Sequence, residues 1–305
     1  MRLSRTLALG ASMLVLIGAC TTGGGSSKPT VKIGSDGFDE ARVVAEAYAQ
    51  VLEAAGYTVD RAGIGLGARK VTAAALESAQ IDVKPEYIGS GLVYYGGASS
   101  NDPAKNKTDL QAKVTSVGGG LTVFGYTAGQ DTNALVVTKA TADKYKLTKW
   151  SDLTAVQAQL KWGLATDCPT NPVCSTALKD SYGIDTTKLQ LTLLEACSTP
   201  MSDALKAGTV DVAELCSTGP EIIVNGWVRL EDDKKTQPAD AIAPLVRNDL
   251  LAKVGDKAVF QKLFDDVSAK IDTATLADLY KQVAVDKKDT KVVASTWLKA
   301  QGLVK

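Results

Sequence analysis

The sequence has 305 residues and no histidine. The lack of imidazole excludes Ser-His-Asp and Cys-His catalysis, histidine general bases and histidine-ligated metals, which removes most common enzyme mechanisms. No charge of one sign is in surplus, because 34 lysines and arginines balance 34 aspartates and glutamates. Without a basic block, the chain lacks the electrostatic pattern of a nucleic-acid-binding protein. We therefore expect a protein that is not an enzyme, uses no cofactor or metal, and has no nucleic-acid partner.

Long apolar runs are confined to the N-terminus. Two arginines precede the apolar stretch 7–17, and small residues lead up to Cys20. This arrangement resembles a bacterial lipoprotein signal. It implies a signal peptide at 1–19, a lipid on Cys20, and a location outside the cytoplasm, anchored to a membrane. An ordinary secretory signal with a chance cysteine is the alternative. Residues 20–29 are rich in Gly, Ser and Thr and predict a flexible tether.

Cysteine is scarce as well. Besides Cys20 there are four cysteines, an even number that favours two disulfides in an exported protein. Two prolines bend the segment between Cys168 and Cys174 into a short loop, and Cys197 and Cys216 each follow a predicted strand. We therefore favour the pairs Cys168–Cys174 and Cys197–Cys216, while the other pairings stay open. A four-cysteine zinc site is disfavoured because no C-x₂₋₄-C spacing occurs.

Short apolar or β-branched segments alternate with amphipathic helices from residue 30 onward, a pattern typical of α/β proteins with parallel sheets. One run of such elements ends before a loop near residue 130, and the pattern restarts after it. A late strand at 241–246 is followed only by helices, which indicates that the chain returns to the first lobe. We therefore predict lobe I from residues 30–130 plus 239–305, and lobe II from residues 131–238.

Two motifs allow an enzymatic alternative. The stretch 63–68 reads G-x-G-x-x-A, with Asp82 further along, as in dinucleotide-binding folds. However, the motif follows the second strand instead of the first, and Asp82 lies near the start of its own strand. A glycine-rich turn that faces a cleft is the preferred interpretation. Glu40 and Glu86 are a conceivable glycosidase pair, but nothing fixes their separation, and exposed surface carboxylates are commoner.

Several segments resemble a single family, in the same order, along nearly the whole chain from residue 31. They include VKIGSDGFDE at 31–40, AYAQVLEAAGY at 47–57, and 75–91, which contains P-E-Y-I-G. DTNALVV at 131–137, CST at 216–218, LEDDK at 230–234 and APLVR at 243–247 continue the order. Together they resemble the substrate-binding proteins of ABC importers for quaternary amines such as glycine betaine and choline. The resemblance implies a type II periplasmic-binding-protein fold, in which two lobes joined by two crossover segments close on a solute.

The resemblance also implies how a solute is held. A quaternary ammonium lies against several tyrosine rings by cation–π attraction, while a basic side chain holds the carboxylate of a betaine. Tyr87 of the P-E-Y motif matches one cage tyrosine. Where relatives carry further cage tyrosines, this chain has Asn133, Cys216 and Asp240. The cage of aromatic rings is therefore incomplete.

The basic residues of the carboxylate clamp are also replaced. Asp36 stands where relatives have a lysine, and Asn171 where they often have an arginine. The candidate ligand-binding residues are then Asp36, Phe38, Tyr87, Asn133, Asn171, Ser217 and Thr218. With more carboxylate and amide groups than cations, this set suits a polar or cationic solute. Core packing is the alternative role for Phe38 and Tyr87, and helix capping or a turn for Asp36.

The sequence thus predicts a monomeric solute-binding lipoprotein. It captures an osmoprotectant-like solute, such as glycine betaine or choline, and delivers it to an ABC permease that a cytoplasmic ATPase drives. A different polar or cationic solute is the first alternative because the aromatic cage is incomplete. A sensory or scaffold lipoprotein with a degenerate cleft, or an extracytoplasmic enzyme, is a further alternative.

Overall fold

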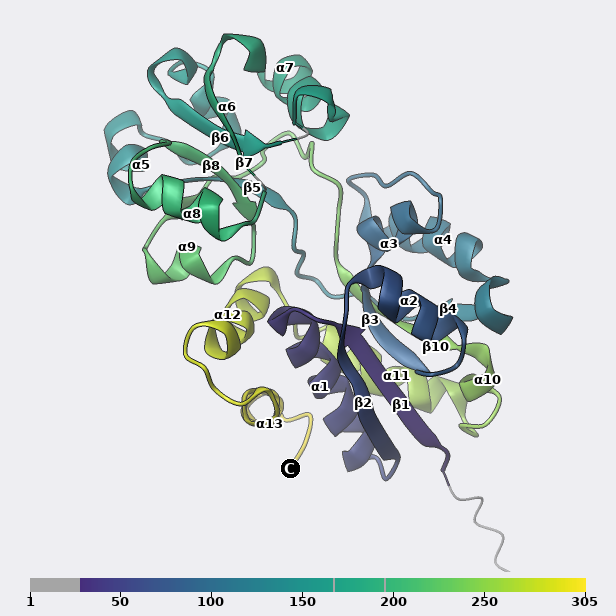
Figure 1. Ribbon diagram of the computed structural model, residues 1–305. Helices are drawn as coiled ribbons and strands as arrows, with labels where there is room; N and C mark the ends of the chain where they lie inside the picture. Colours follow the sequence, from purple (N-terminus) through teal and green to yellow (C-terminus); the bar gives the residue numbers. More distant parts are fainter. Residues whose placement is uncertain (1–27, 167, 195) are drawn as a thin grey trace, which may run out of the picture.

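The computed structural model describes residues 28–166, 168–194 and 196–305. The predicted signal peptide, Cys20 and most of the tether lie outside these residues. Two lobes, each with a five-stranded sheet, are joined by two chain segments (Figure 1). The prediction of two α/β lobes with two crossovers, and of a chain that returns to the first lobe, is confirmed. Within the described part of the chain, no helix combines the length and the apolar character needed to cross a membrane.

The sheet of lobe I has the strand order β2-β1-β3-β10-β4. Its first three strands in the chain are parallel, while β10 runs antiparallel to both of its neighbours. The strands are β1 (Thr30–Asp36), β2 (Thr58–Gly67), β3 (Val83–Tyr87), β4 (Leu121–Val123) and β10 (Ile242–Arg247). The helices are α1 (Asp39–Ala54), α2 (Arg69–Glu77), α3 (Ile88–Tyr94), α4 (Pro103–Val114), α10 (Asn248–Leu251), α11 (Lys257–Ser268), α12 (Thr273–Ala284) and α13 (Thr290–Ala300).

Helix α1 holds lobe I together. Its buried alanine and valine positions recur at helical spacing, and they pack against the sheet and against α11, α12 and α13. The ring of Tyr48 lies 5.2 Å from that of Phe264 in α11, and its hydroxyl is 2.9 Å from that of Ser268. Since only two residues separate the end of β1 from the start of α1, the first turn of α1, which includes Glu40, is fixed at one end of the sheet.

The sheet of lobe II has the strand order β7-β6-β8-β5-β9. Its elements are β5 (Asn133–Val137), α5 (Lys139–Tyr145), α6 (Trp150–Leu153), β6 (Lys161–Ala165), α7 (Ala177–Tyr182), β7 (Gln190–Leu194), α8 (Thr199–Lys206), β8 (Val212–Cys216), α9 (Pro220–Val224) and β9 (Val228–Arg229). Both predicted disulfides, Cys168–Cys174 and Cys197–Cys216, are present in this lobe. Cys216 is the last residue of its strand and does not follow it.

The glycine-rich stretch 63–67 is not a turn, so that prediction is wrong. Strand β2 continues through Gly67 and pairs with β1 along this stretch. A Cβ atom on Gly63 would lie 2.4 Å from the side chain of Ile81 and 2.9 Å from the carbonyl oxygen of Ile33. Glycine is needed at this position because Ile81 covers the two strands closely, and not because a ligand approaches the backbone.

Candidate functional site

Two extended segments connect the lobes and run side by side. The first leads from β4 into β5, and the second from β9 into β10. Gln130 forms a bridge with Ala241, and the amide of Asp131 donates to the carbonyl oxygen of Asp240 at 3.2 Å. Side chains alternate along an extended chain. As a result, Asp131 and Asp240 face one side of the pair, whereas Gln130 and Ala239 face the other.

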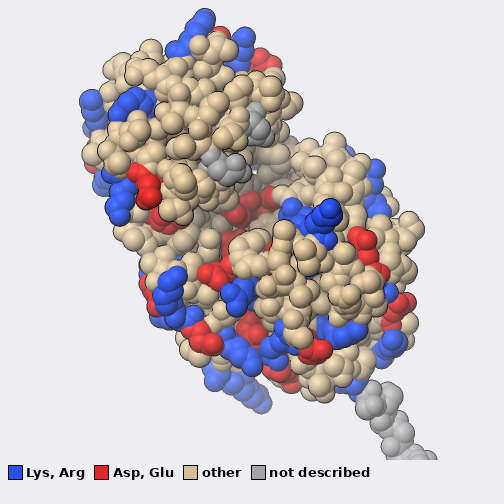
Figure 2. Space-filling model, viewed as in Figure 1, with Lys and Arg blue, Asp and Glu red and all other residues tan. Residues whose placement is uncertain are grey.

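A cavity lies on each side of the paired segments. The cavity on the side of the aspartates, here the cleft cavity, has a volume of about 360 Å³. Lobe I contributes Arg69 and Ser90 to its walls, and lobe II contributes Asn133 and Val173. The cavity on the opposite side, here the hinge cavity, has a volume of about 420 Å³. Acidic side chains, drawn in red, lie in the hollow between the lobes (Figure 2).

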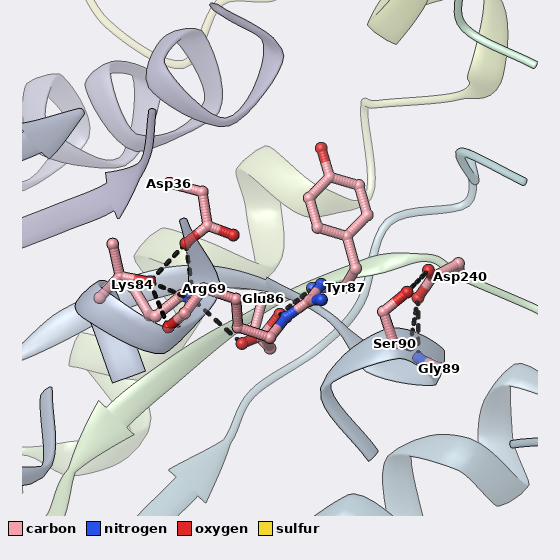
Figure 3. Close-up of polar contacts among 9 residues, drawn as sticks. Asp36, Arg69, Lys84, Glu86, Tyr87, Gly89, Ser90 and Asp240 are labelled. Atoms are coloured by element: carbon pink, nitrogen blue, oxygen red, sulfur yellow. Dashed lines mark hydrogen bonds and ion pairs between the residues drawn. The ribbon is translucent and has the colours of Figure 1, made fainter. Parts of the chain in front are cut away.

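Asp240 is held rigidly against lobe I. Its Oδ1 accepts hydrogen bonds from the amides of Gly89 at 2.8 Å and Ser90 at 3.0 Å, and its Oδ2 accepts one from the Ser90 hydroxyl (Figure 3). Burial raises the pKa of Asp240 to about 6, although the hydrogen bonds from Ser90 and the charge of Arg69 act in the opposite direction. The carboxylate is therefore ionised at neutral pH and cannot swing out of the cavity wall without losing these bonds.

Arg69 lies at the edge of a buried ion-pair network in lobe I. Its Nε donates to Glu86 Oε1 at 3.0 Å, and Lys84 Nζ lies 3.0 Å from Glu86 Oε2. Lys84 also pairs with Asp36 at 3.0 Å (Figure 3). The Lys84 and Glu86 side chains are fully buried, whereas 27% of the Arg69 side chain is exposed. The network thus positions a guanidinium group on the cavity wall.

Glu40 and Tyr87 form a second buried polar group. The Tyr87 hydroxyl donates to Glu40 Oε1. Burial and the nearby charge of Asp131 raise the pKa of Glu40 to about 8, against the effect of the Tyr87 hydrogen bond. The Thr218 hydroxyl is also buried close to Glu40 and, like the Tyr87 hydroxyl, lowers the pKa of that carboxyl group. The ring of Phe38, which is 42% exposed, lies 5.7 Å from that of Tyr87.

Comparison with known proteins identifies the family of this chain. Residues 29–300 match the substrate-binding domain of ABC-type glycine betaine transport systems. The chain belongs to this family. It is 28% identical to the glycine betaine-binding protein YehZ of Escherichia coli (strain K12), over 98% of this chain and 99% of that one. It is 26% identical to the glycine-betaine-binding protein of Pseudomonas aeruginosa, over 99% and 96%.

Solved structures agree on the fold. A crystal structure described as a glycine betaine/carnitine/choline ABC transporter superimposes with a TM-score of 0.79, covering 90% of this chain and 99% of that one at 24% identity. The type II periplasmic-binding-protein fold is therefore confirmed. As a member of this family, the protein binds a solute for an ABC importer outside the cytoplasm, and the cleft cavity between the lobes is the candidate binding site.

The predicted site residues do not all meet at the cleft. Asn133 lines the cleft cavity, and its Nδ2 donates to Glu214 Oε1 at 2.8 Å. The amide of Thr218 donates to Asp131 Oδ1 at 3.2 Å, and Ser217 Oγ accepts from the amide of Thr132 at 3.0 Å. These residues belong to one region with Phe38 and Tyr87, which adjoin Glu40.

Two predicted residues lie elsewhere. Asp36 ends β1 inside lobe I, where it pairs with Lys84 and accepts a hydrogen bond from the Thr72 hydroxyl. Asn171 accepts a hydrogen bond from the amide of Val173 at 3.0 Å, as the N-cap of a short helical turn. Of the seven candidate residues, all within the described part of the chain, only Asn133 is among those that line the cleft cavity, and Ser217 is among those that line the hinge cavity.

The positions that the resemblance links to further cage tyrosines are occupied by polar or cross-linked groups. Asn133 and Cys216 are register partners on β5 and β8, and Cys216 is bonded to Cys197. Asp240 is tied to Ser90. Phe38 and Tyr87 adjoin Glu40, and burial together with the charges of Glu40 and Asp131 raises the pKa of the nearby Tyr280 in α12. The cleft cavity itself is lined mainly by polar side chains.

The sequence did not single out several residues of this site. Asp131 belongs to a segment that matches the family, but its cleft position depends on pairing with a segment more than a hundred residues later. Arg69 depends in the same way on Glu86. The expectation that Glu40 and Glu86 are exposed surface carboxylates is wrong, because both are almost completely buried. Each has a hydrogen-bonding partner, Tyr87 or Arg69, that makes its burial tolerable.

Proposed function

We propose that this protein captures a small solute with an ammonium head group, such as glycine betaine or choline, and delivers it to the permease of an ABC importer that a cytoplasmic ATPase drives. The observation that carries the proposal is the cleft cavity, into which Asp131 and Asp240 project between the two lobes. A cavity of this kind encloses a small molecule and supplies the negative charge that a cation requires. The protein performs no chemistry on the solute.

The head group of the solute approaches Tyr87 and Phe38 in this proposal. A quaternary ammonium has no hydrogen to donate, so ring faces and carboxylates are its natural partners. The two rings lie 5.7 Å apart next to the Glu40 carboxyl. Lobe II contributes Asn133, which lines the cleft cavity, and Thr218, whose amide donates to Asp131. Ser217 lies on the side of the hinge cavity. Asp36 acts indirectly, through the Lys84 network that positions Arg69, and Asn171 stabilises the nearby loop.

Closure of the lobes completes the site. The paired segments are the connections on which the lobes rotate, and a solute that contacts both lobes favours the closed form. The N-terminal features complete the proposal. Residues 1–19 direct export, and a lipid on Cys20 anchors a monomeric protein to the membrane through the tether at 20–29. The basis for this is the sequence pattern of apolar stretch, small residues and cysteine.

A different polar or cationic solute is the second candidate. It is favoured by the same cavity, because three positions linked to aromatic rings hold Asn133, Cys216 and Asp240 instead. Polyamines or cationic amino acids would use the carboxylates without needing an aromatic cage. A solute panel of betaines, choline, carnitine, amino acids, polyamines and sugars separates the two candidates, and a sensory or scaffold protein would respond to none of them.

The test is a thermal-shift screen of that panel followed by calorimetry on the purified protein. A solute that binds the folded state at one hundred times its Kd raises the free energy of unfolding by about 2.7 kcal/mol. Tyr87→Ala should weaken binding of the best ammonium solute about tenfold, and Tyr145→Ala, in α5 of lobe II, serves as the control. No response to any ammonium solute, or equal affinity for wild type and Tyr87→Ala, would contradict the proposal.

A further inference from the structure

We propose that Asp240 is a selectivity residue, which makes the cleft prefer ammonium solutes that have no carboxylate over zwitterionic betaines. This inference rests on the proposed function, because it concerns which ammonium solutes the cleft accepts. The matched pair of solutes is choline and glycine betaine. They share a trimethylammonium group and differ in that choline ends in a hydroxyl where glycine betaine ends in a carboxylate.

The donors that could receive a carboxylate on this wall of the cavity are already used. Gly89 and Ser90 both line the cleft cavity, and both donate their amides to Asp240 Oδ1. The Ser90 hydroxyl donates to Asp240 Oδ2. A side chain of the protein therefore takes the hydrogen bonds that the carboxylate of a solute would need. The three bonds also keep the Asp240 carboxylate in the wall, where it repels a second anion.

The charges around the cavity act in the same direction. Asp131 and Asp240 line it from the two crossover segments. Arg69 is the single cationic side chain among the described residues that line it, and its Nε is bonded to Glu86. Glu40, beside Asp131, keeps its proton near neutral pH and so does not change this balance of charge. Negative groups thus outnumber positive ones around the solute, so a net cation is favoured over a zwitterion.

The hydroxyl of a choline-like solute has suitable partners. The buried Thr218 hydroxyl lies close to Asp131 and Glu40 and, against the effect of burial, lowers the pKa of both carboxyl groups. Asp131 Oδ1 accepts a hydrogen bond from the amide of Thr218 at 3.2 Å, so Asp131 and Thr218 are adjacent. A hydroxyl can donate to a carboxylate oxygen and accept from a threonine hydroxyl, whereas a carboxylate can only accept. This difference strengthens the preference that the charges create.

The experiment measures the affinities of choline and glycine betaine by calorimetry at pH 7.5 for the wild-type protein and for Asp240→Asn. The wild type should bind choline at least tenfold more tightly than glycine betaine. Asp240→Asn preserves the size of the side chain and an oxygen that accepts from Gly89 and Ser90, but removes the charge. In Asp240→Asn, the ratio of the affinity for choline to the affinity for glycine betaine should fall tenfold or more. Asp143→Asn removes an exposed aspartate charge on lobe II and should leave the ratio unchanged.

The outcomes separate this inference from the proposed function. A wild-type protein that prefers glycine betaine overturns the selectivity proposal and leaves the proposed function intact, and this holds even where the variant fails to fold. An unchanged ratio in a folded Asp240→Asn protein overturns it as well. If no ammonium solute binds to the wild type, the proposed function fails, and the selectivity proposal fails with it.

Discussion

Glu40 and Asp240 are carboxyl groups whose pKa values are shifted by the fold to near neutral pH. The pKa of Glu40 is raised to about 8 and that of Asp240 to about 6, in both cases mainly by burial. Since the chain has no histidine, these buried acids are the groups that titrate near neutral pH, as histidine side chains do in many proteins. Protonation near neutral pH therefore occurs in the cleft itself.

The first prediction concerns Glu40 and stability. In the unfolded chain Glu40 ionises near its ordinary pKa of 4.5, but in the folded protein it keeps its proton to about pH 8. Between these values the folded state binds more protons, so the free energy of unfolding falls as pH rises. Glu40→Gln should flatten this part of the curve in melting temperatures measured from pH 4.5 to 9 without solute. The exposed Glu231→Gln serves as the control, and an unchanged slope in Glu40→Gln would contradict the assignment.

At the level of single residues, sequence reasoning found the cleft only in part. Tyr87 could be proposed from the sequence because it stands in the recognisable P-E-Y motif. Arg69 was not, because its position depends on a hydrogen bond with Glu86 that no local pattern announces. Asp36 was expected at the solute, but the buried Lys84 on the neighbouring strand β3 pairs with it. Side-chain partners set by sheet order are the kind of information that a single sequence does not display.

At the level of elements, the paired crossover segments do most to define the site. Their alternation directs Asp131 and Asp240 to the cleft and Gln130 to the hinge cavity. The late strand expected at 241–246 is β10, at 242–247, since apolar periodicity is a local signal. The exception is β2, in which the glycines favoured a turn locally, while contact with Ile81 accounts for Gly63 in the folded protein.

The second prediction concerns the two disulfides of lobe II. The separations of 6 residues for Cys168–Cys174 and 19 for Cys197–Cys216 correspond to a loss of about 2 and about 3 kcal/mol of unfolding free energy when each bond is removed. Paired cysteine-to-serine variants and urea unfolding measure this. The larger loss should follow removal of Cys197–Cys216. The reverse order would show that loop closure does not dominate their contribution.

At the level of the whole molecule, two bodies rotate about two connections. The lobes also touch at a second place, where α12 of lobe I packs against α9 of lobe II. Glu221 of α9 has its pKa raised by burial and by the charge of Asp131, so this contact lies near the acidic cleft.

The third prediction concerns this movement. A saturating amount of the best ammonium solute should reduce the radius of gyration in small-angle X-ray scattering, because the solute stabilises the closed form. A sugar that does not shift the melting temperature is the control and should leave the scattering unchanged. Binding in calorimetry without any compaction would show that the solute does not bring the lobes together.

The order of strands has a consequence for synthesis. Strand β4 pairs with β10, and β10 follows the last strand of lobe II in the chain. A nascent chain leaving the ribosome therefore contains all of lobe II, with both of its cysteine pairs, before lobe I can close its sheet. Lobe II is a continuous insert in the chain, whereas the sheet of lobe I is completed only by the strand β10 that follows it. The cleft cavity is thus the last part of the protein to form.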